Sequence, residues 1–314
     1  MKKIYALFLL AGIWHAAGAQ QEQQYTQFMF NKLVFNPAYA GSFESPTLTA
    51  IYRKQWMGLE GAPESQVLTY NQRMLNNRVG IGGTLSRNSI GISRSVTLDV
   101  PYSYRIPTRR GYISVGLQFN VRHLYQNWND PRLKPSQQLD NALPTDAQSK
   151  FLVNFGCGIY YTGYTWFAGL GVPRLLDNNI DFLDIDGELS REVQHFNGIA
   201  GADFLLSEDL KFTPQVLLRY VPGAPFDAEA NASLLLKQKF YGGLTYRMGG
   251  DTNGAGESVD VLLGMQATEN LFFCLSYDIG LTRLRQYNNG SVEATLRWWF
   301  NPPADPDIKL PTGN

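Results

Sequence analysis

Long stretches of this chain alternate between apolar and polar residues. In residues 271–281 every second side chain is apolar, and the positions between them include Ser276 and Asp278. The same period appears in residues 112–122 and 291–300. A period of two residues is the signature of a β-strand with one apolar and one polar face. Strands of this length predict a large sheet whose two faces meet different environments.

Fourteen segments show this alternation, whereas we find no segment of similar length that repeats at the period of an α-helix. We expect strands at 47–56, 65–74, 78–88, 93–106, 111–124, 150–161, 164–172, 193–206, 210–221, 226–237, 239–249, 257–267, 270–282 and 290–300. The predicted fold class is therefore all-β, in one large domain.

The joins between the expected strands differ in length according to their order. The even-numbered joins are short and lie at 76–77, 107–110, 162–163, 207–209, 238–239 and 269–270. The odd-numbered joins include the long ones, at 57–64, 125–149, 173–192, 250–256 and 283–289. In an up-and-down meander the two sets lie at opposite ends of the strands. Short turns at one end and long loops at the other are typical of an outer-membrane barrel.

We therefore predict an antiparallel transmembrane β-barrel of the outer-membrane type, with about 14 strands. A soluble, secreted β-sandwich is the alternative, because it also has strands with one apolar face. Aromatic residues near the expected strand ends favour the barrel, and so does closure, which leaves no free sheet edges. An even strand number places both ends of the strand region at the short-turn end, which faces the periplasm.

The ends of the chain predict export. Residues 1–19 read as a secretory signal, with Lys2 and Lys3 before an apolar stretch and a small-residue cleavage site at 17–19. We expect residues 20–46 to form a periplasmic N-terminal arm and a turn into the first strand, with a short helix or an extended segment at 20–34. The barrel should cover 47–300, and 301–314 should form a periplasmic C-terminal tail.

The chain carries little that predicts catalysis. After removal of the expected signal, the histidines are His123 and His195, and we find no zinc-protease, redox, nucleophile-elbow or phosphate-loop motif. We therefore expect no enzyme activity, no catalytic residue, no cofactor and no metal site. The acidic segment 177–188 does not match an EF-hand spacing, and whether it binds calcium stays open.

Charge excludes one class of partner and predicts a polar lumen. The chain has 27 Lys and Arg residues against 27 Asp and Glu residues, a balance that gives no support for nucleic-acid binding. Asp278, Glu293 and Arg297 fall on polar strand faces, as does Arg53. Opposite charges across a narrow barrel tend to pair, so the lumen is either plugged by such pairs or open.

Several blocks of the sequence resemble one known family. They are QQYTQFMFNKLVFNPAYAGS at 23–42, YRKQWMGLEGAPESQVLTYN at 52–71, VGIGGTLSRNSIGISRSVTLDVPYSYRI at 79–106, GVPRLL at 171–176 and SYDIGLTRLRQYNNGSVEATLRWWF at 276–300. Together they resemble the PorP/SprF family of type IX secretion system outer-membrane proteins. The resemblance implies an integral outer-membrane barrel without enzymatic activity that works with the type IX secretion machinery. It further implies surface adhesins as cargo, including those of gliding motility, and peptidoglycan-bound periplasmic proteins as partners.

The residues that carry the resemblance around the first expected strand form a candidate cluster. They are Asn36, Pro37, Tyr39, Gly41, Arg53, Gln55 and Trp56. Pro37 restricts its own φ and that of the preceding residue, Gly41 tolerates a positive φ, and Arg53 and Gln55 should point into the barrel. Trp56 should end the strand at the outer girdle. The cluster is either a partner site or a part of the barrel framework. A passive porin with 124–148 as its constriction loop is the alternative function.

Overall fold

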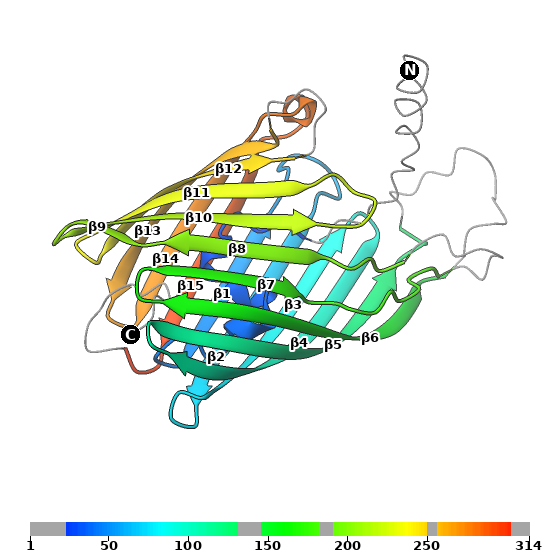
Figure 1. Cartoon of the computed structure of the whole chain (residues 1–314). Coiled ribbons are helices and arrows are strands. Elements are labelled where there is room, and N and C mark those ends of the chain that lie inside the picture. The colour runs from blue at the N-terminus through cyan, green and yellow to red at the C-terminus, as the bar shows by residue number, and fades with distance from the viewer. Residues whose placement is uncertain (1–22, 131–145, 183–190, 250–255, 303–314) are drawn as a thin grey trace, which may run out of the picture.

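The computed structural model describes residues 23–130, 146–182, 191–249 and 256–302. Its strands form one closed antiparallel barrel (Figure 1). The strands are β1 Thr47–Lys54, β2 Glu64–Met74, β3 Val79–Ile90, β4 Ser93–Thr108, β5 Gly111–Gln126, β6 Gln148–Gly163, β7 Trp166–Val172, β8 Phe196–Ala202, β9 Phe204–Ser207, β10 Leu210–Tyr220, β11 Asp227–Leu236, β12 Phe240–Met248, β13 Ser258–Thr268, β14 Leu271–Gly280 and β15 Ser291–Trp299.

The predicted fold class is confirmed. β8 and β9 both pair with β10 and are separated by Asp203 alone, so they form one interrupted strand of a 14-stranded barrel. The barrel closes where β1 pairs with β15, with Thr47 opposite Trp299. Closure satisfies the backbone groups of both terminal strands, which would otherwise be free edges.

The alternation seen in the sequence separates the two faces of the wall. Side chains such as Leu117, Leu170 and Leu263 point outward and are more than 60% exposed. On β15 the neighbours Thr295 and Leu296 are 0% and 47% exposed, because successive side chains of a strand point to opposite faces. The outer face is therefore apolar and the inner face polar. No helix in the described part of the chain is long and apolar enough to span a membrane.

The joins divide the barrel into two unlike ends. At the short-turn end, the joins are 75–78, 109–110, 164–165, 208–209, 237–239 and 269–270. At the loop end, they are 55–63, 91–92, 127–147, 173–195, 221–226, 249–257 and 281–290, the last of which contains the 3₁₀ helix η4 Arg283–Gln286. Both ends of the strand region, Thr47 and Trp299, lie at the short-turn end.

Residues 23–46 lie inside the barrel, and we call this segment the plug (Figure 1). It contains three short 3₁₀ helices, η1 Phe28–Phe30, η2 Lys32–Val34 and η3 Pro37–Tyr39. Phe28 and Met29 are fully buried. We expected these residues to form an arm outside the barrel. Instead the plug lies in the lumen, where its apolar side chains pack with inward-facing apolar residues of the strands to form the core of the protein. Residues 1–22 and 303–314, with the expected signal and most of the tail, lie outside the described residues.

Candidate functional site in the barrel lumen

The segment FNPAYAG at 35–41 packs against glycines of the inner wall. These glycines lie on four strands, β3, β5, β6 and β7. A Cβ atom built on each would approach a plug atom far too closely: Gly80 to Ala40 O at 2.1 Å, Gly116 to Ala38 N at 2.2 Å, Gly158 to Asn36 Oδ1 at 2.1 Å and Gly171 to Phe35 O at 2.4 Å. A glycine inside a strand often marks close approach of another backbone. The wall is thus shaped to this part of the plug.

Asn36 fixes the middle of the plug to two strands. Its Oδ1 accepts a hydrogen bond from the Ala38 N–H at 2.9 Å, which caps η3. Its Nδ2 donates to Ile159 O at 3.0 Å and to Leu170 O at 3.1 Å, on β6 and β7. Pro37 follows at the first position of η3, where a missing N–H removes no helical hydrogen bond. The Asn-Pro pair therefore forms a turn and also attaches it to the wall.

Gly41 is required where the plug approaches the short-turn end. Its φ is +70°, in the left-handed region, and its N–H donates to Asn71 Oδ1 at 2.6 Å. A Cβ here would lie 2.5 Å from the Gly80 Cα. Tyr39, 1% exposed, packs edge to face with Tyr160 at a centroid distance of 5.3 Å. Backbone conformation and space thus both demand glycine at position 41.

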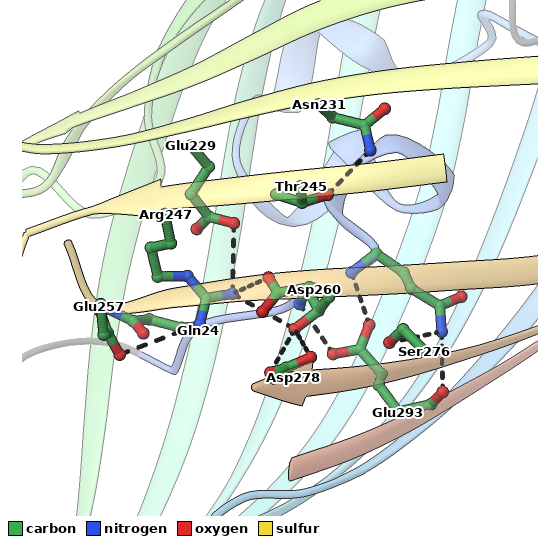
Figure 2. Close-up of polar contacts among 12 residues, drawn as sticks. Gln24, Glu229, Asn231, Thr245, Arg247, Glu257, Asp260, Ser276, Asp278 and Glu293 are labelled. Carbon is green, nitrogen blue, oxygen red and sulfur yellow. Dashed lines mark hydrogen bonds and ion pairs between the residues drawn. The ribbon is translucent and has the colours of Figure 1, made fainter. Parts of the chain in front are cut away.

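A buried ion-pair network holds the first residues of the plug near the loop end. Arg53 contacts Asp278 at 2.8 Å and Glu293 at 3.2 Å, and these side chains are at most 4% exposed. The Glu293 carboxylate also accepts hydrogen bonds from the Thr26 and Gln27 N–H groups, both at 2.9 Å. Arg53 on β1 and Asp278 on β14 also contact the Thr26 hydroxyl, so three strands converge on Thr26 and Gln27 of the plug. Figure 2 shows Asp278 and Glu293 in this arrangement.

A second group of charges adjoins the first. Arg247 lies 3.3 Å from Glu229 and 3.6 Å from Asp260 (Figure 2). Its guanidinium also donates to the Thr26 hydroxyl at 3.3 Å. Arg219 contacts the same glutamate at 2.7 Å. Buried charges of this kind persist only when paired and hydrogen-bonded. Because Thr26 hydrogen-bonds to Arg53 and Arg247, the plug is joined to both groups of paired charges.

Arg297, nearer the short-turn end, is held by hydrogen bonds and by an aromatic ring. Arg297 donates from Nε to Thr49 Oγ1 at 3.1 Å and from Nη2 to the Phe30 carbonyl. Its guanidinium carbon lies 4.6 Å from the centroid of the Phe43 ring. A buried guanidinium over an aromatic face gains a cation–π attraction. We expected Arg297 to be one of the lumen charges, and it lies inside the barrel against the plug.

The candidate cluster is divided between the plug and the loop end. Asn36, Pro37, Tyr39 and Gly41 are buried in the plug, and Arg53 is buried in the network. Gln55 and Trp56 follow β1, half-buried, beside a cavity of about 290 Å³ at the loop end. The Trp56 N–H donates to Ser291 Oγ at 3.1 Å. The cluster therefore does not form one continuous surface.

Sequence reasoning missed the contributions of Thr26, Gln27 and Lys32. Lys32 is fully buried, and its Nζ lies 3.5 Å from the centroid of the Phe167 ring. Sequence reasoning also missed the groove that the wall glycines Gly80, Gly116, Gly158 and Gly171 form for the plug. The glycines within predicted strands were the available signal, since such glycines weaken a strand unless they have a packing role.

A larger cavity of about 530 Å³ lies at the loop end, beside Gln23 and Tyr25 of the plug. Glu192, in the join between β7 and β8, contacts Arg122 at 2.8 Å and Arg174 at 3.3 Å beside this cavity. Burial acts to raise the pKa of Glu192, but the two guanidinium groups, with hydrogen bonds from Asn154 and Asn178, hold its pKa below the ordinary value. These contacts fasten the loop to the wall.

No metal centre is evident in the part of the chain that is described, where no three His, Cys, Asp or Glu side chains are placed to hold an ion. Asp184, Asp186 and Glu188 of the acidic segment 177–188 lie outside the described residues. The ring of His123 packs on Phe151, with centroids 4.5 Å apart.

We compared the chain with solved structures, curated sequences and protein-family models. The outer membrane protein Omp33 of Acinetobacter baumannii is similar to 82% of this chain over 98% of its own length, at 7% identity and a TM-score of 0.47. The monoaromatic hydrocarbon channel CymD is similar to 92% of this chain over 95% of its own, at 12% identity and a TM-score of 0.48. No curated protein sequence matches the chain. The model of the type IX secretion system membrane protein family PorP/SprF matches residues 17–298, which confirms the resemblance noted in the sequence. The chain belongs to the PorP/SprF family of type IX secretion system membrane proteins.

Proposed function

We propose that this barrel is a non-enzymatic outer-membrane component of the type IX secretion system that supports the secretion or surface anchoring of adhesins, as in gliding motility. It acts through its two ends, contacting peptidoglycan-bound periplasmic machinery at the short-turn end and adhesin cargo at the loop end. Family membership supports the secretion role. The observation that favours an anchoring and contact role is the filled lumen, because a filled barrel is not suited to transport solutes.

A conducting barrel needs a continuous aqueous path, as porins have. Here Phe28, Met29 and Phe30 occupy the lumen with no more than 1% exposure. The wall glycines leave no spare width beside residues 35–41. The two cavities described above include loop-end residues and border plug residues 23–25, and the larger one also reaches Val34 of the plug. A barrel packed in this way is better suited to bind other proteins than to conduct solutes.

The short-turn end supports a role in protein contact. Leu75, in the turn between β2 and β3, is 70% exposed, and Leu205 on β9 is 78% exposed. These two side chains are the contact area that we propose for a partner at the membrane boundary. The proposed periplasmic partners would meet this end.

The experiment is deletion of the gene with two readouts on the same cells. We expect one or a few adhesins to disappear from the surface, while uptake of small solutes stays unchanged. The purified barrel in planar bilayers should show no steady open-channel conductance. Unchanged adhesin display together with impaired solute uptake and steady conductance would instead establish the passive porin.

A matched pair of variants tests whether the candidate cluster is a partner site. Gln55→Ala and Trp56→Phe change half-buried residues at the loop end and should leave the plug in place. If these residues meet a partner, adhesin display falls although barrel abundance, judged by heat-modifiable gel migration, is normal. Display that falls only in proportion to abundance would show that Gln55 and Trp56, the half-buried part of the cluster, are framework.

A further inference from the structure

The plug has a defined direction through the barrel. Its beginning lies at the loop end, where Gln24 Nε2 donates to Asp227 Oδ2 at 3.3 Å. Asp227 is the first residue of β11 and follows the loop-end join 221–226. Thr26 bonds to Asp278, two residues before the end of β14 at that same mouth. The contacts therefore place residues 24–26 among the loop-end residues of the wall.

The plug finishes at the opposite end. Arg73 is the second-to-last residue of β2. It donates from Nε to Gly41 O at 3.0 Å and from Nη2 to Ser42 O at 3.1 Å. The turn that follows β2 is one of the short turns. Thr47 then begins β1 opposite Trp299, at the same end. Residues 23–46 thus cross the lumen from the loop end to the short-turn end, and β1 returns alongside them.

An opening is present where the plug begins. Gln23 borders the cavity of about 530 Å³ together with Ser89 and Ser93, which flank the loop-end turn between β3 and β4. Gln23 itself is therefore adjacent to open space at the loop end, which is where we infer that the chain before it leaves the barrel. To leave at the short-turn end instead, it would have to pass back beside residues 26–42, which are buried throughout apart from Val34.

We infer that the N-terminal end of the chain leaves the barrel at the cell surface, beside the long loops, whereas β15 ends on the periplasmic side. Outer-membrane barrels carry their long loops outside and their short turns in the periplasm. The two ends of the mature chain then lie on opposite sides of the membrane, unlike the expectation from strand number alone. With cleavage after Ala19, three residues, 20–22, precede Gln23.

This arrangement has a consequence for assembly and one for recognition. Because β1 and β15 close the barrel around residues 23–46, the plug enters the lumen either before that pair forms or by threading its free N-terminal end through the closed barrel. The N-terminal end also becomes part of the face that a secreted adhesin would meet, a consequence that rests on the proposed function. The direction of the plug itself does not depend on secretion.

The test is an epitope inserted between Gln21 and Glu22, compared with the same epitope at Gln137 in a long loop and at Arg109 in a short turn. On intact cells we expect antibody labelling of the N-terminal insertion to match that of the loop insertion. The turn insertion should be labelled only after permeabilisation. An N-terminal insertion that becomes accessible only after permeabilisation, like the turn insertion, overturns the inference.

A crosslink provides a second measurement if the insertion disturbs assembly. In a chain carrying Cys157→Ser and Cys274→Ser, Gln24→Cys is paired either with Asp227→Cys or with Arg109→Cys, and a short bis-maleimide is added to the assembled barrel. The first pair should be bridged and the second should not. Bridging of the second pair without the first would place the start of the plug at the short-turn end. Both tests report position only, so their failure is distinguishable from failure of the secretion role.

Discussion

Gly116→Ala should displace the plug without unfolding the barrel. The added Cβ would lie 2.2 Å from the Ala38 nitrogen, 2.5 Å from the Ala38 Cα and 2.5 Å from the Pro37 carbonyl carbon. Ordinary contacts begin at 3.4 Å, so the nearest pair must separate by 3.4 − 2.2 = 1.2 Å. Every atom in the way belongs to the backbone, and no side-chain rotation relieves the clash. The plug must therefore shift as a whole or leave this part of the groove.

The expected magnitude follows from the cost of overpacking a core. Such changes typically cost about 1–3 kcal/mol. A backbone clash on a segment already tied by Asn36 and Gly41 belongs at the upper end, about 3 kcal/mol. At about 1.4 kcal/mol per tenfold, this corresponds to a roughly 100-fold larger population of the displaced plug. The strand hydrogen bonds of the wall are not involved, so the barrel itself should persist.

Hydrogen exchange measures this change directly. In Gly116→Ala the amides of residues 38–41 should lose about 100-fold of their protection, in line with the factor above. Heat-modifiable migration should show an intact barrel, and planar bilayers should show new conductance events. The control is Gly83→Ala, because a Cβ at Gly83 has nothing within 4 Å. The reasoning is refuted if plug exchange is unchanged in Gly116→Ala, or if the control loses protection equally.

Three further predictions concern the wall, the ion-pair network and the loop. Leu296→Arg, on the outer face, should impair barrel assembly by up to about 2–4 kcal/mol when near the membrane midplane, whereas Leu296→Phe should not; heat-modifiable migration measures both. Glu293→Gln leaves Arg53 with one carboxylate fewer and should destabilise the barrel by up to about 3–5 kcal/mol in thermal unfolding, with faster exchange of the Gln27 amide; an unchanged melting temperature would contradict the role of this network. Because the pKa of Glu192 is held below its ordinary value, its stabilising effect is present above the unfolded pKa and lost as the pH falls through the folded one. The difference in melting temperature between wild type and Glu192→Gln should therefore shrink on acidification from pH near 6 to about 3, and a constant difference would exclude the ionised carboxylate as its source.

Strand number and phase were predictable from the sequence because both depend on local alternation. The expected strand at 111–124 is β5 Gly111–Gln126, and the expected strand at 65–74 is β2 Glu64–Met74. The interruption at Asp203 was not apparent, since residues 193–206 read as one strand. Each strand must present an apolar face to one environment and a polar face to the other, so a shift by one residue would reverse every side chain.

The partners of the lumen residues could only be partly anticipated. Arg53, Asp278 and Glu293 were expected to face inward because of their phase, but the phase does not say which strands meet across the lumen. Arg297 was grouped with these charges, yet its partners in the plug are the Phe30 carbonyl and the Phe43 ring. Pairing across a barrel depends on closure and tilt, which are properties of the whole sheet.

The plug was decided by tertiary structure alone. Residues 23–46 show neither a strand period nor a helix period, and their contacts are remote in sequence; the Thr26 N–H and Glu293 are 267 residues apart. The wall glycines Gly80, Gly116 and Gly158 are also separate in sequence, and only the closed sheet brings them together as one groove. Alternation is local because it reports how one strand partitions its side chains between two faces. Occupation of the lumen and the direction of the plug are nonlocal because they depend on which distant strands enclose the same space.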